Sequence, residues 1–434
     1  MTTPPPVVPV PLYGPEHAAD PRRSWDLLRQ QGPVGVAQID PQVSVYVVTD
    51  PRAALTLLKD AETWTKDSRH WMHLVPQNSP VRPNVEWRHS LFFTDGVEHA
   101  HLRRVITDSL VLLDPRHVRD VTLRFADLLL QNFAHTGGAD LVAQYAQQLP
   151  PMILNALFGG LDEQAPHLHA ILAALMSTDL NAKAEGEKAL ASYLGMLLGT
   201  KFAQRGPDLT SWYIDHPNQL TPENVGEQTV ITAGAAYPTL TGLISNALAR
   251  LLSDNRYRGT LTTGTLTIEA AIDEVLWNDP PLAMYSLHFP RVDTELHGAF
   301  IPAGAPVMVS YAAANTCPYT NPSGDGHRSG IKAHLAFAAG PHACPARKTA
   351  LLIAATAIER LVSYLPDIEL AVPRDQLTYH RGPFYRLLTT LPCRFTPLAP
   401  ETQGATPWGR ATKPARTTPT VPLQHAAGRP PVSA

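Results

Sequence analysis

The residues with the clearest chemical potential lie between Phe337 and Arg347, in the phrase FAAGPHACPAR. Cys344 is one of only three cysteines in 434 residues, and it follows a Gly-Pro-His turn and precedes a long apolar stretch. We expect this turn to hold the thiol at a helix N-terminus, where the helix dipole and free N–H groups favour the thiolate. A thiolate held there can act as a soft metal ligand or as a nucleophile.

A second group of candidate residues lies in DGVEHAHLRR, which is typical of the start of a helix. Asp95 can cap this helix, and Glu98 three residues later completes a capping-box pattern. His99 and Arg103 are four residues apart, so they share one face. Two donors on one face suit the recognition of a pair of carboxylates, although a solvated basic face is the commoner meaning of such a pair.

The cysteine phrase resembles the haem-ligand loop of the cytochrome P-450 family, which runs Phe-x-x-Gly-x-His-x-Cys-x-Gly. Ala346 stands where the last glycine is expected. The residues that match the pattern are Phe337, Gly340, His342 and Cys344. The resemblance extends over roughly residues 10 to 398 and is to the soluble bacterial type. It implies haem b as the cofactor, with the Cys344 thiolate as axial ligand of the iron. Electron donation from such a thiolate favours O–O cleavage.

The same resemblance implies roles for the residues around that haem. His99 and Arg103 match a His-x-x-x-Arg pair that binds the haem propionates. Arg291 and His342 match two further propionate donors. Phe337 matches an aromatic residue that shields the sulfur. Taken without the resemblance, these last three are a surface arginine at a strand edge, a turn residue and a core aromatic.

The chain departs from the family at its Glu-x-x-Arg motif, because the aligned stretch reads EVLW. Trp277 takes the place of the arginine that normally pairs with the glutamate, here Glu274. Leaving one buried charge without its partner costs on the order of 3–5 kcal/mol. Glu274 must therefore find another partner, be hydrated or be protonated, and Arg328 is the candidate. The departure looks like an unusual bacterial subgroup that carries tryptophan at this position.

A second departure falls on the expected central helix, whose middle reads AGAAYPT. The family carries an acid and an alcohol here that help to deliver protons to bound dioxygen, and Ala236 and Tyr237 replace them. Pro238 should kink the helix, and Gly234 suits the close approach of a ligand to the backbone. Either Tyr237 or Thr239 relays protons with water admitted by the kink, or Tyr237 only packs in the pocket.

The pattern of elements predicts a mainly α fold with small peripheral β-sheets, which is the cytochrome P-450 fold by resemblance. β-Branched runs predict strands over 34–36 and 43–48, and extended segments are expected over 289–310, 368–372 and 387–395. Helical patterns run from Asp95 almost to Asn278, and again over 349–364. We expect residues 11–398 to form one haem-thiolate catalytic domain, with a disordered segment at 1–10 and a disordered Pro/Thr-rich tail at 399–434.

Composition narrows the possible partners and location. The net charge of −3 gives no case for nucleic acid or an anionic membrane as partner. Three cysteines without a CxxC pair argue against a disulfide framework and a cysteine-rich zinc site. The proline-rich N-terminus lacks the basic and apolar regions of a signal peptide or anchor, so a cytoplasmic protein is expected.

These features predict a haem-thiolate oxidoreductase that activates dioxygen to oxidise a small organic substrate, by hydroxylation or oxidative coupling, in secondary metabolism. The resemblance implies a ferredoxin and a ferredoxin reductase as electron donors. Arg347 and Lys348 would suit an acidic ferredoxin, or they are simply solvated basic residues. The alternative is a haem-binding protein with weak or no monooxygenase activity, which acts as a sensor or partner-bound module.

Overall fold

A 32-residue helix, α11 (Pro222–Ser253), forms the centre of the helical part of the chain. The computed structural model describes residues 8–175, 179–254, 267–318 and 331–399. The main unit spans Met1–Leu398, and a second unit, Ala399–Ala434, lies outside the described residues apart from its first residue. The expected disordered ends therefore fall almost wholly outside the described part of the chain.

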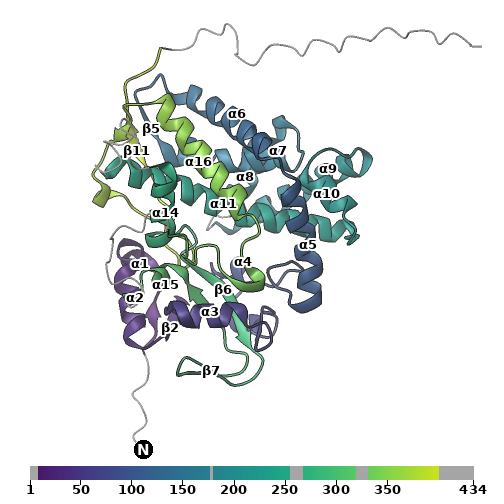
Figure 1. Cartoon of the computed structure of the whole chain (residues 1–434), viewed down its shortest axis with the longest axis vertical. Helices are drawn as coiled ribbons and strands as arrows, with labels where there is room; N and C mark the ends of the chain where they lie inside the picture. The colour runs from purple at the N-terminus through teal and green to yellow at the C-terminus, as the bar shows by residue number, and fades with distance from the viewer. Residues whose placement is uncertain (1–7, 176–178, 255–266, 319–330, 400–434) are drawn as a thin grey trace, which may run out of the picture. The chain divides into compact units, whose positions relative to one another are not determined.

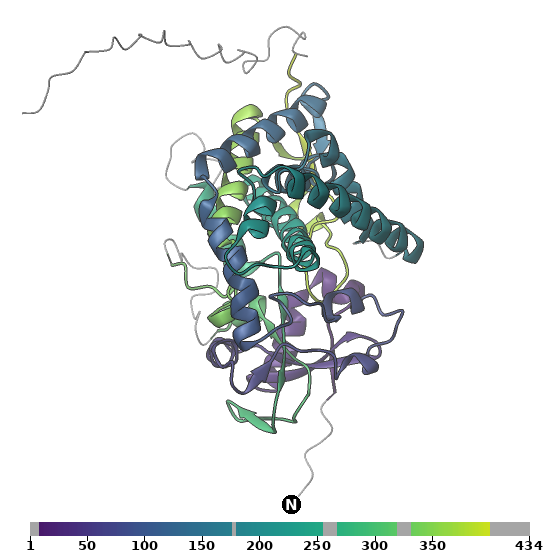
Figure 2. The ribbon, with the colours of Figure 1, turned by 90° about the vertical axis from the view of Figure 1, so that its right-hand side faces the viewer.

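The long helices gather on one side of the main unit, and most strands lie on the other together with several short helices (Figure 1); a view turned by 90° shows the same separation (Figure 2). Among the described residues, the remaining longer helices are α5 (Gly96–Leu112), α6 (Pro115–Phe133), α8 (Ala165–Leu175), α9 (Leu180–Ala203), α14 (Ile268–Asn278) and α16 (Arg347–Tyr364). The shorter ones are α1 (Gly14–Ala19), α2 (Pro21–Gln30), α3 (Pro51–Lys59), α4 (Arg82–Val85), α7 (Leu149–Leu157), α10 (Leu209–Asp215) and α15 (Tyr311–Asn315).

Helix starts follow from local chemistry at several of these elements. Thr221 caps α11 by accepting a hydrogen bond from the Asn224 N–H at 3.2 Å, and Pro222 occupies the first helical position, as the sequence predicts. Asp50 caps α3 by accepting from two backbone N–H groups at 2.9 Å each. Apolar faces of α6, α7, α11 and α16 then bury one another in the largest hydrophobic core.

The main sheet has six strands in the order β1-β2-β3-β9-β6-β4. These strands are β1 (Val10–Pro11), β2 (Val34–Asp40), β3 (Val43–Val48), β4 (Trp64–Thr65), β6 (Met284–Pro290) and β9 (Val307–Ser310). The pair β2–β3 is an antiparallel hairpin, whereas β9 pairs in parallel with β3 from more than 250 residues away in the chain. The predicted strands over 34–36 and 43–48 are confirmed, and so is the mainly α fold with small sheets.

Two small sheets complete the architecture. The first joins β10 (Glu369–Leu370), β11 (Pro392–Arg394) and β5 (Gly138–Asp140), and the second joins β7 (Thr294–Leu296) and β8 (Ala299–Ile301). The strand β5 interrupts a region expected to be helical throughout. Its three residues carry no strand pattern, and pairing with β11 is what makes them extended. Among the described residues, no helix combines the length and the apolar character needed to cross a lipid bilayer.

Candidate cofactor site

The cysteine loop is held by its own backbone and by α3. The Cys344 N–H donates to the Phe337 carbonyl at 2.9 Å, and the Ala343 N–H donates to the Gly340 carbonyl at 3.1 Å. Gly340 has φ +69, and a Cβ there would lie 2.0 Å from the Leu58 carbonyl oxygen of α3. Only glycine fits such a close approach in a left-handed conformation. The loop is therefore pressed against a helix some 280 residues earlier in the sequence.

Two alanines of the loop differ in backbone conformation. Ala346, which stands where the family pattern has glycine, has φ −93, so alanine is accepted there without strain. Ala338 has φ +57, in the left-handed region that costs a non-glycine residue about 1–2 kcal/mol. The backbone therefore favours glycine at position 338, where the chain has alanine. It does not require glycine at position 346, where the family pattern has one.

Helix α16 begins at Arg347, so Cys344 precedes it by three residues and the thiol does not lie within the first turn. Burial raises the pKa of the Cys344 thiol, while the Ala346 N–H and the charges of Arg103 and Arg347 act in the opposite direction. The expected lowering by the helix N-terminus is therefore outweighed in the protein alone. The side chain is nevertheless accessible, and coordination to a metal ion would deprotonate it outright.

Basic side chains of helix α5 and of the cysteine loop itself meet at this point. The rings of His99 on α5 and His342 in the loop stack with centroids 3.9 Å apart. Arg103, one turn further along α5, donates from Nη2 to the Ala343 carbonyl at 2.6 Å. The predicted pair His99 and Arg103 therefore shares a face that is turned to the cysteine loop and not to solvent.

Two atoms of this group lack hydrogen-bond partners although they are buried. They are His99 Nε2 and Arg103 Nη1. An unsatisfied buried donor costs about 1–3 kcal/mol, and more when charged, so such atoms normally have a partner. Carboxylates are the natural partners for a guanidinium and an imidazole N–H. The orphaned atoms therefore fit the carboxylate side of a haem-like cofactor.

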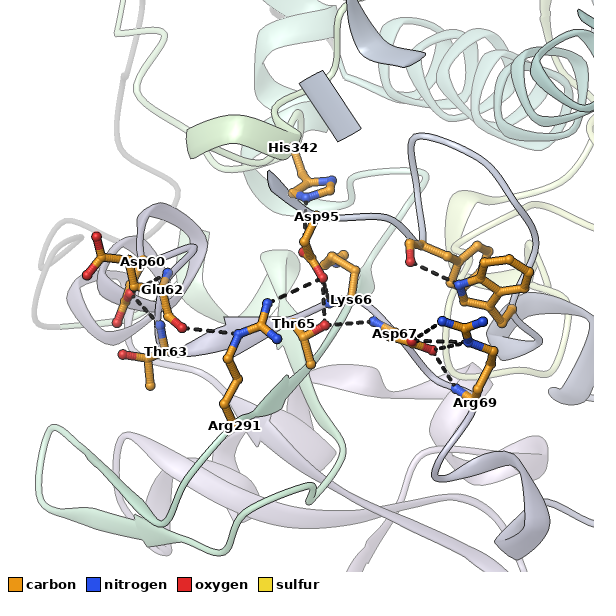
Figure 3. A network of polar contacts seen from close by, with 12 residues as sticks. Asp60, Glu62, Thr63, Thr65, Lys66, Asp67, Arg69, Asp95, Arg291 and His342 are labelled. Atoms are coloured by element: carbon orange, nitrogen blue, oxygen red, sulfur yellow. Dashed lines mark hydrogen bonds and ion pairs between the residues drawn. The ribbon is translucent and has the colours of Figure 1, made fainter. Parts of the chain in front are cut away.

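Asp95 organises the outer part of this site (Figure 3). Its carboxylate accepts hydrogen bonds from the Thr65 hydroxyl at 2.6 Å and the Lys66 N–H at 2.9 Å. It also lies 3.8 Å from Arg291 Nη2 and 3.9 Å from His342 Nε2. Asp95 occupies the N-cap position of α5, as predicted, but its side chain makes no cap bond. The predicted capping box is wrong because these other donors engage the carboxylate.

Lys66 is a member of the cluster that the sequence did not single out. It follows β4, and its side chain is only 5% exposed, with Nζ 3.5 Å from the Ser286 hydroxyl. Burial lowers its pKa to about 7, and Asp95 opposes that shift. Its sequence context, TWTKDSR, is that of an ordinary exposed lysine. Only the pairing of β4 with β6 carries it inward.

Burial and mutual repulsion govern the histidines of the cluster. Burial lowers the pKa of His99 to about 4, with a smaller lowering by Arg103. Burial also lowers the pKa of His342 to about 2, and Lys66 adds to that effect. Both imidazoles are therefore neutral near pH 7 in the protein alone. A ligand that brings negative charge would favour the protonated forms and would relieve this repulsion.

Arg291 lies at the edge of the site. It follows β6 directly, its Nε donates to the Glu62 carbonyl at 3.2 Å, and its side chain is 48% exposed. Phe337 lies on the other side of the loop, where Arg347 places its guanidinium 5.3 Å from the ring centre. The structure thus brings His99, Arg103, His342 and Arg291 around Asp95 and the cysteine loop.

The middle of α11 combines open and filled positions. A Cβ added at Gly234 would meet nothing within 4 Å, and the residue is exposed in a helix that is otherwise largely buried. Tyr237 is buried against His169 of α8, with ring centroids 6.4 Å apart. The Thr239 hydroxyl donates to the Ala235 carbonyl at 2.7 Å, so it is engaged with its own helix. The assignments of Tyr237 and Thr239 to proton transfer stay predictions.

Glu274 of α14 forms an ion pair with Arg250 of α11. The candidate partner named from the sequence, Arg328, lies outside the described residues. Trp277 donates from Nε1 to the Ile331 carbonyl at 2.8 Å. Glu274 and Trp277 are therefore both held by contacts to other segments.

Comparisons with known proteins agree with this geometry. No protein-family model matches the chain. The chain is 28% identical over 409 residues to the cytochrome P450 monooxygenase PikC of Streptomyces venezuelae, with 91% of this chain and 95% of the relative covered. It is 27% identical to a vitamin D(3) 25-hydroxylase of Pseudonocardia autotrophica, with 87% of this chain and 94% of the relative covered.

Solved structures give the same class. CYP154C4 from Streptomyces sp. W2061 superposes with a TM-score of 0.80 at 23% identity, covering 89% of this chain and 98% of the other. CYP154A1 from Streptomyces coelicolor A3(2) superposes with a TM-score of 0.75 at 25% identity, covering 88% of this chain and 99% of the other. The chain has the cytochrome P450 fold. Relatives that the chain resembles over most of their length are named as cytochrome P450 enzymes, and the orphaned donors of the site fit the haem b that this class of enzyme uses.

A first prediction concerns the strained loop. Replacing Ala338 with glycine should raise the free energy of unfolding by about 1 kcal/mol, because glycine adopts the left-handed conformation without a steric penalty. Urea unfolding followed by circular dichroism measures the change. Ala346→Gly is the matched control, since φ −93 gives glycine no advantage there and a small loss is expected. An equal gain in both variants would contradict the interpretation.

A second prediction uses the buried lysine. The unfolded chain holds Lys66 with a pKa near 10.4 and the folded one with a pKa of about 7, so the unfolded state binds more protons between these values. This residue therefore makes stability rise as the pH increases from about 7 towards 10. Lys66→Met should reduce that rise in the haem-free protein, measured by urea unfolding at pH 7 and pH 9.5. Lys188→Met, at an exposed lysine, should leave it unchanged.

Proposed function

We propose that Cys344 would supply the thiolate ligand of haem iron, and that the chain oxidises a small organic substrate of secondary metabolism with dioxygen. The observation that carries the proposal is the meeting of an accessible cysteine with buried basic groups that lack partners. Bound haem supplies the redox chemistry by which dioxygen is used. The protein's own residues hold that group, exclude water and position the substrate.

The basic cluster binds the haem carboxylates in this proposal. His99 and Arg103 supply the two orphaned donors, and His342 stacks on His99 and keeps its ring in place. Arg291 approaches from the half-exposed edge. Lys66 adds a fifth basic group, which is deeply buried and whose charged form is favoured by Asp95. Phe337 covers the sulfur from within the loop.

Substrate would lie beside α11, where Gly234 leaves open space. Tyr237 is available to interact there, because its hydroxyl makes no hydrogen bond to another described residue and its ring packs against His169. Burial raises its pKa to about 12, so it is a proton donor and not a phenolate near neutral pH. We assign it the role of proton donor towards the open space, with Thr239 as a secondary candidate.

Names of relatives indicate the range of chemistry. They include a 2-hydroxy-5-methyl-1-naphthoate 7-hydroxylase of Streptomyces carzinostaticus and a biflaviolin synthase of Streptomyces coelicolor. These names support hydroxylation or oxidative coupling of a small organic substrate. Electrons would come from a ferredoxin and its reductase in the cytoplasm, with Arg347 and Lys348 beside the cysteine loop as contacts for an acidic partner.

A second candidate function is a haem protein with weak or no monooxygenase activity. It is favoured by the loss of the acid at Ala236 and by the Thr239 hydroxyl, which is bonded to its own helix. Turnover with a reconstituted ferredoxin and reductase distinguishes the two. Electron consumption without product would favour the second candidate.

Cys344→Ser tests the ligand directly. We expect the reduced carbon-monoxide complex to lose its thiolate-type Soret band, because serine does not supply a soft anionic sulfur. Absorbance spectra of wild type and variant measure this. Cys393→Ser is the matched control, since that cysteine is buried in β11 away from the loop and the thiolate-type band should persist. A band that survives in Cys344→Ser would reject the assignment.

Tyr237→Phe tests the proton donor. We expect a larger share of the consumed electrons to appear as hydrogen peroxide, because general acid–base groups typically contribute about 10²–10⁴-fold to proton transfer. The measurement compares NADPH consumption with peroxide formed in the reconstituted system. Tyr193→Phe on α9, whose hydroxyl bonds to Asn155, is the control. If both variants behave as wild type, Tyr237 only packs in the core.

A further inference from the structure

The tryptophan that replaces the motif's arginine lies at the end of a connected set of contacts. The replaced arginine would have balanced Glu274, but in this chain Glu274 pairs with Arg250 of the neighbouring helix α11. Arg250 also lies 3.7 Å from Asp254, one turn further along. Helix α11 thus supplies a cation for the glutamate, so the residue at position 277 does not have to be a cation.

Trp277 instead reaches the segment that leads into the cysteine loop. Its Nε1 donates to the Ile331 carbonyl at 2.8 Å. Its ring meets the ring of His334 edge to face, with centroids 5.8 Å apart and planes at 88°. Edge-to-face geometry is a favoured arrangement of aromatic rings. The C-terminal end of α14 therefore holds residues 331–334 by one hydrogen bond and one ring contact.

The contacts continue from His334 to the cysteine. The His334 ring lies 5.9 Å from the ring of Phe337, which in turn carries the guanidinium of Arg347 at 5.3 Å. The Phe337 carbonyl accepts the Cys344 N–H at 2.9 Å. Trp277, His334 and Phe337 thus form an unbroken path from α14 to the backbone of Cys344. We call these three residues the ring path.

His334 shows that the ring path works through packing. The residue is only 6% exposed, and both of its ring nitrogens are buried without hydrogen-bond partners. An imidazole in this state carries the cost of unsatisfied polar atoms, so hydrogen bonding does not explain its position. Burial, the largest cause, keeps the ring neutral by lowering its pKa to about 4. What the residue offers to its neighbours is an aromatic surface.

A second tie runs beside the ring path. Asn315 of α15 donates to the Leu276 carbonyl at 3.0 Å and accepts from the Leu335 N–H at 2.7 Å. Its side chain therefore bridges the residue before Trp277 to the residue after His334. The segment remains attached to α14 when Trp277 is changed, so a variant at this position tests the placement of the loop without releasing the whole segment.

We propose that Trp277 is a positioning residue for Cys344, which acts through the ring path to hold the cysteine loop in the conformation that presents its sulfur. The proposal rests on the proposed function in taking Cys344 as the haem ligand. It assigns to the tryptophan a task different from that of the arginine it replaces. Arg250 pairs with the glutamate of the motif, and Trp277 holds the segment that leads into the cysteine loop.

The test follows the loop in the haem-loaded enzyme by two independent readouts. One is amide hydrogen exchange of residues 335–344, and the other is the fraction of the reduced carbon-monoxide complex with a thiolate-type Soret band. For Trp277→Ala we expect exchange in this segment to be about tenfold faster, since a ring contact and a hydrogen bond are lost. The thiolate-type fraction should fall in the same variant.

Conservative variants separate the ring path from general stability. His334→Phe keeps an aromatic ring and removes the unpartnered nitrogens, so wild-type exchange and spectrum are expected, whereas His334→Ala should behave as Trp277→Ala. Trp277→Arg restores the family's residue but removes the ring, and it should also loosen the loop. Trp212→Ala on α10, another half-buried tryptophan, should leave exchange at 335–344 unchanged.

The outcomes distinguish the two proposals. Wild-type exchange and spectrum in Trp277→Ala would overturn the positioning role and leave Cys344 as ligand intact. Faster exchange throughout the chain, or an equal effect of Trp212→Ala, would also overturn it by showing a merely structural role. If wild type itself gives no thiolate-type band, the proposed function fails, whatever the exchange rates of the variants.

Discussion

The surplus of buried basic groups beside the cysteine loop constrains the rest of this structure. Lys66, His99 and Arg103 are buried or half-buried, and Asp95 is the acid whose charge acts on Lys66 and His99. In the protein alone the histidines respond by staying neutral, and the lysine pKa falls to about 7. Buried charge of one sign is costly unless it is paired. A ligand with carboxylates of its own would pair these groups, as the proposed function requires.

The positions of these groups depend on contacts between distant parts of the chain. Lys66 is carried inward by the pairing of β4 with β6, and His99 and Arg103 by the packing of α5 beside the cysteine loop. Gly340 allows the loop to meet the backbone of α3 at a distance that no other residue permits. Because each of these contacts joins separate segments, the site is complete only when the sheet and the helices have both formed.

The stretch EVLW shows how a half-buried glutamate can take its cation from another helix. Glu274 keeps a cation, but the cation comes from Arg250 on another helix. Trp277 then contacts the segment that leads to the cysteine loop, through Ile331 and His334. A sequence pattern defines a glutamate–arginine pair by spacing along one helix, whereas the physical requirement is only that opposite charges lie within reach. Neighbouring helices can satisfy that requirement equally well.

The sequence by itself determined the class of fold, the strands over 34–36 and 43–48, the start of α11 at Pro222 and the segment that carries the cysteine. These depend on local chemistry: alternating β-branched residues, a capping threonine, a proline at a first helical position and glycine in a tight turn. Tertiary structure alone decided that Lys66 is buried, that Asp95 binds Thr65 and Lys66 instead of capping α5, that β5 pairs with β11 and that Arg250 serves Glu274. Each of these depends on residues far apart in the chain, and spacing along the chain carries no information about which distant groups packing brings together.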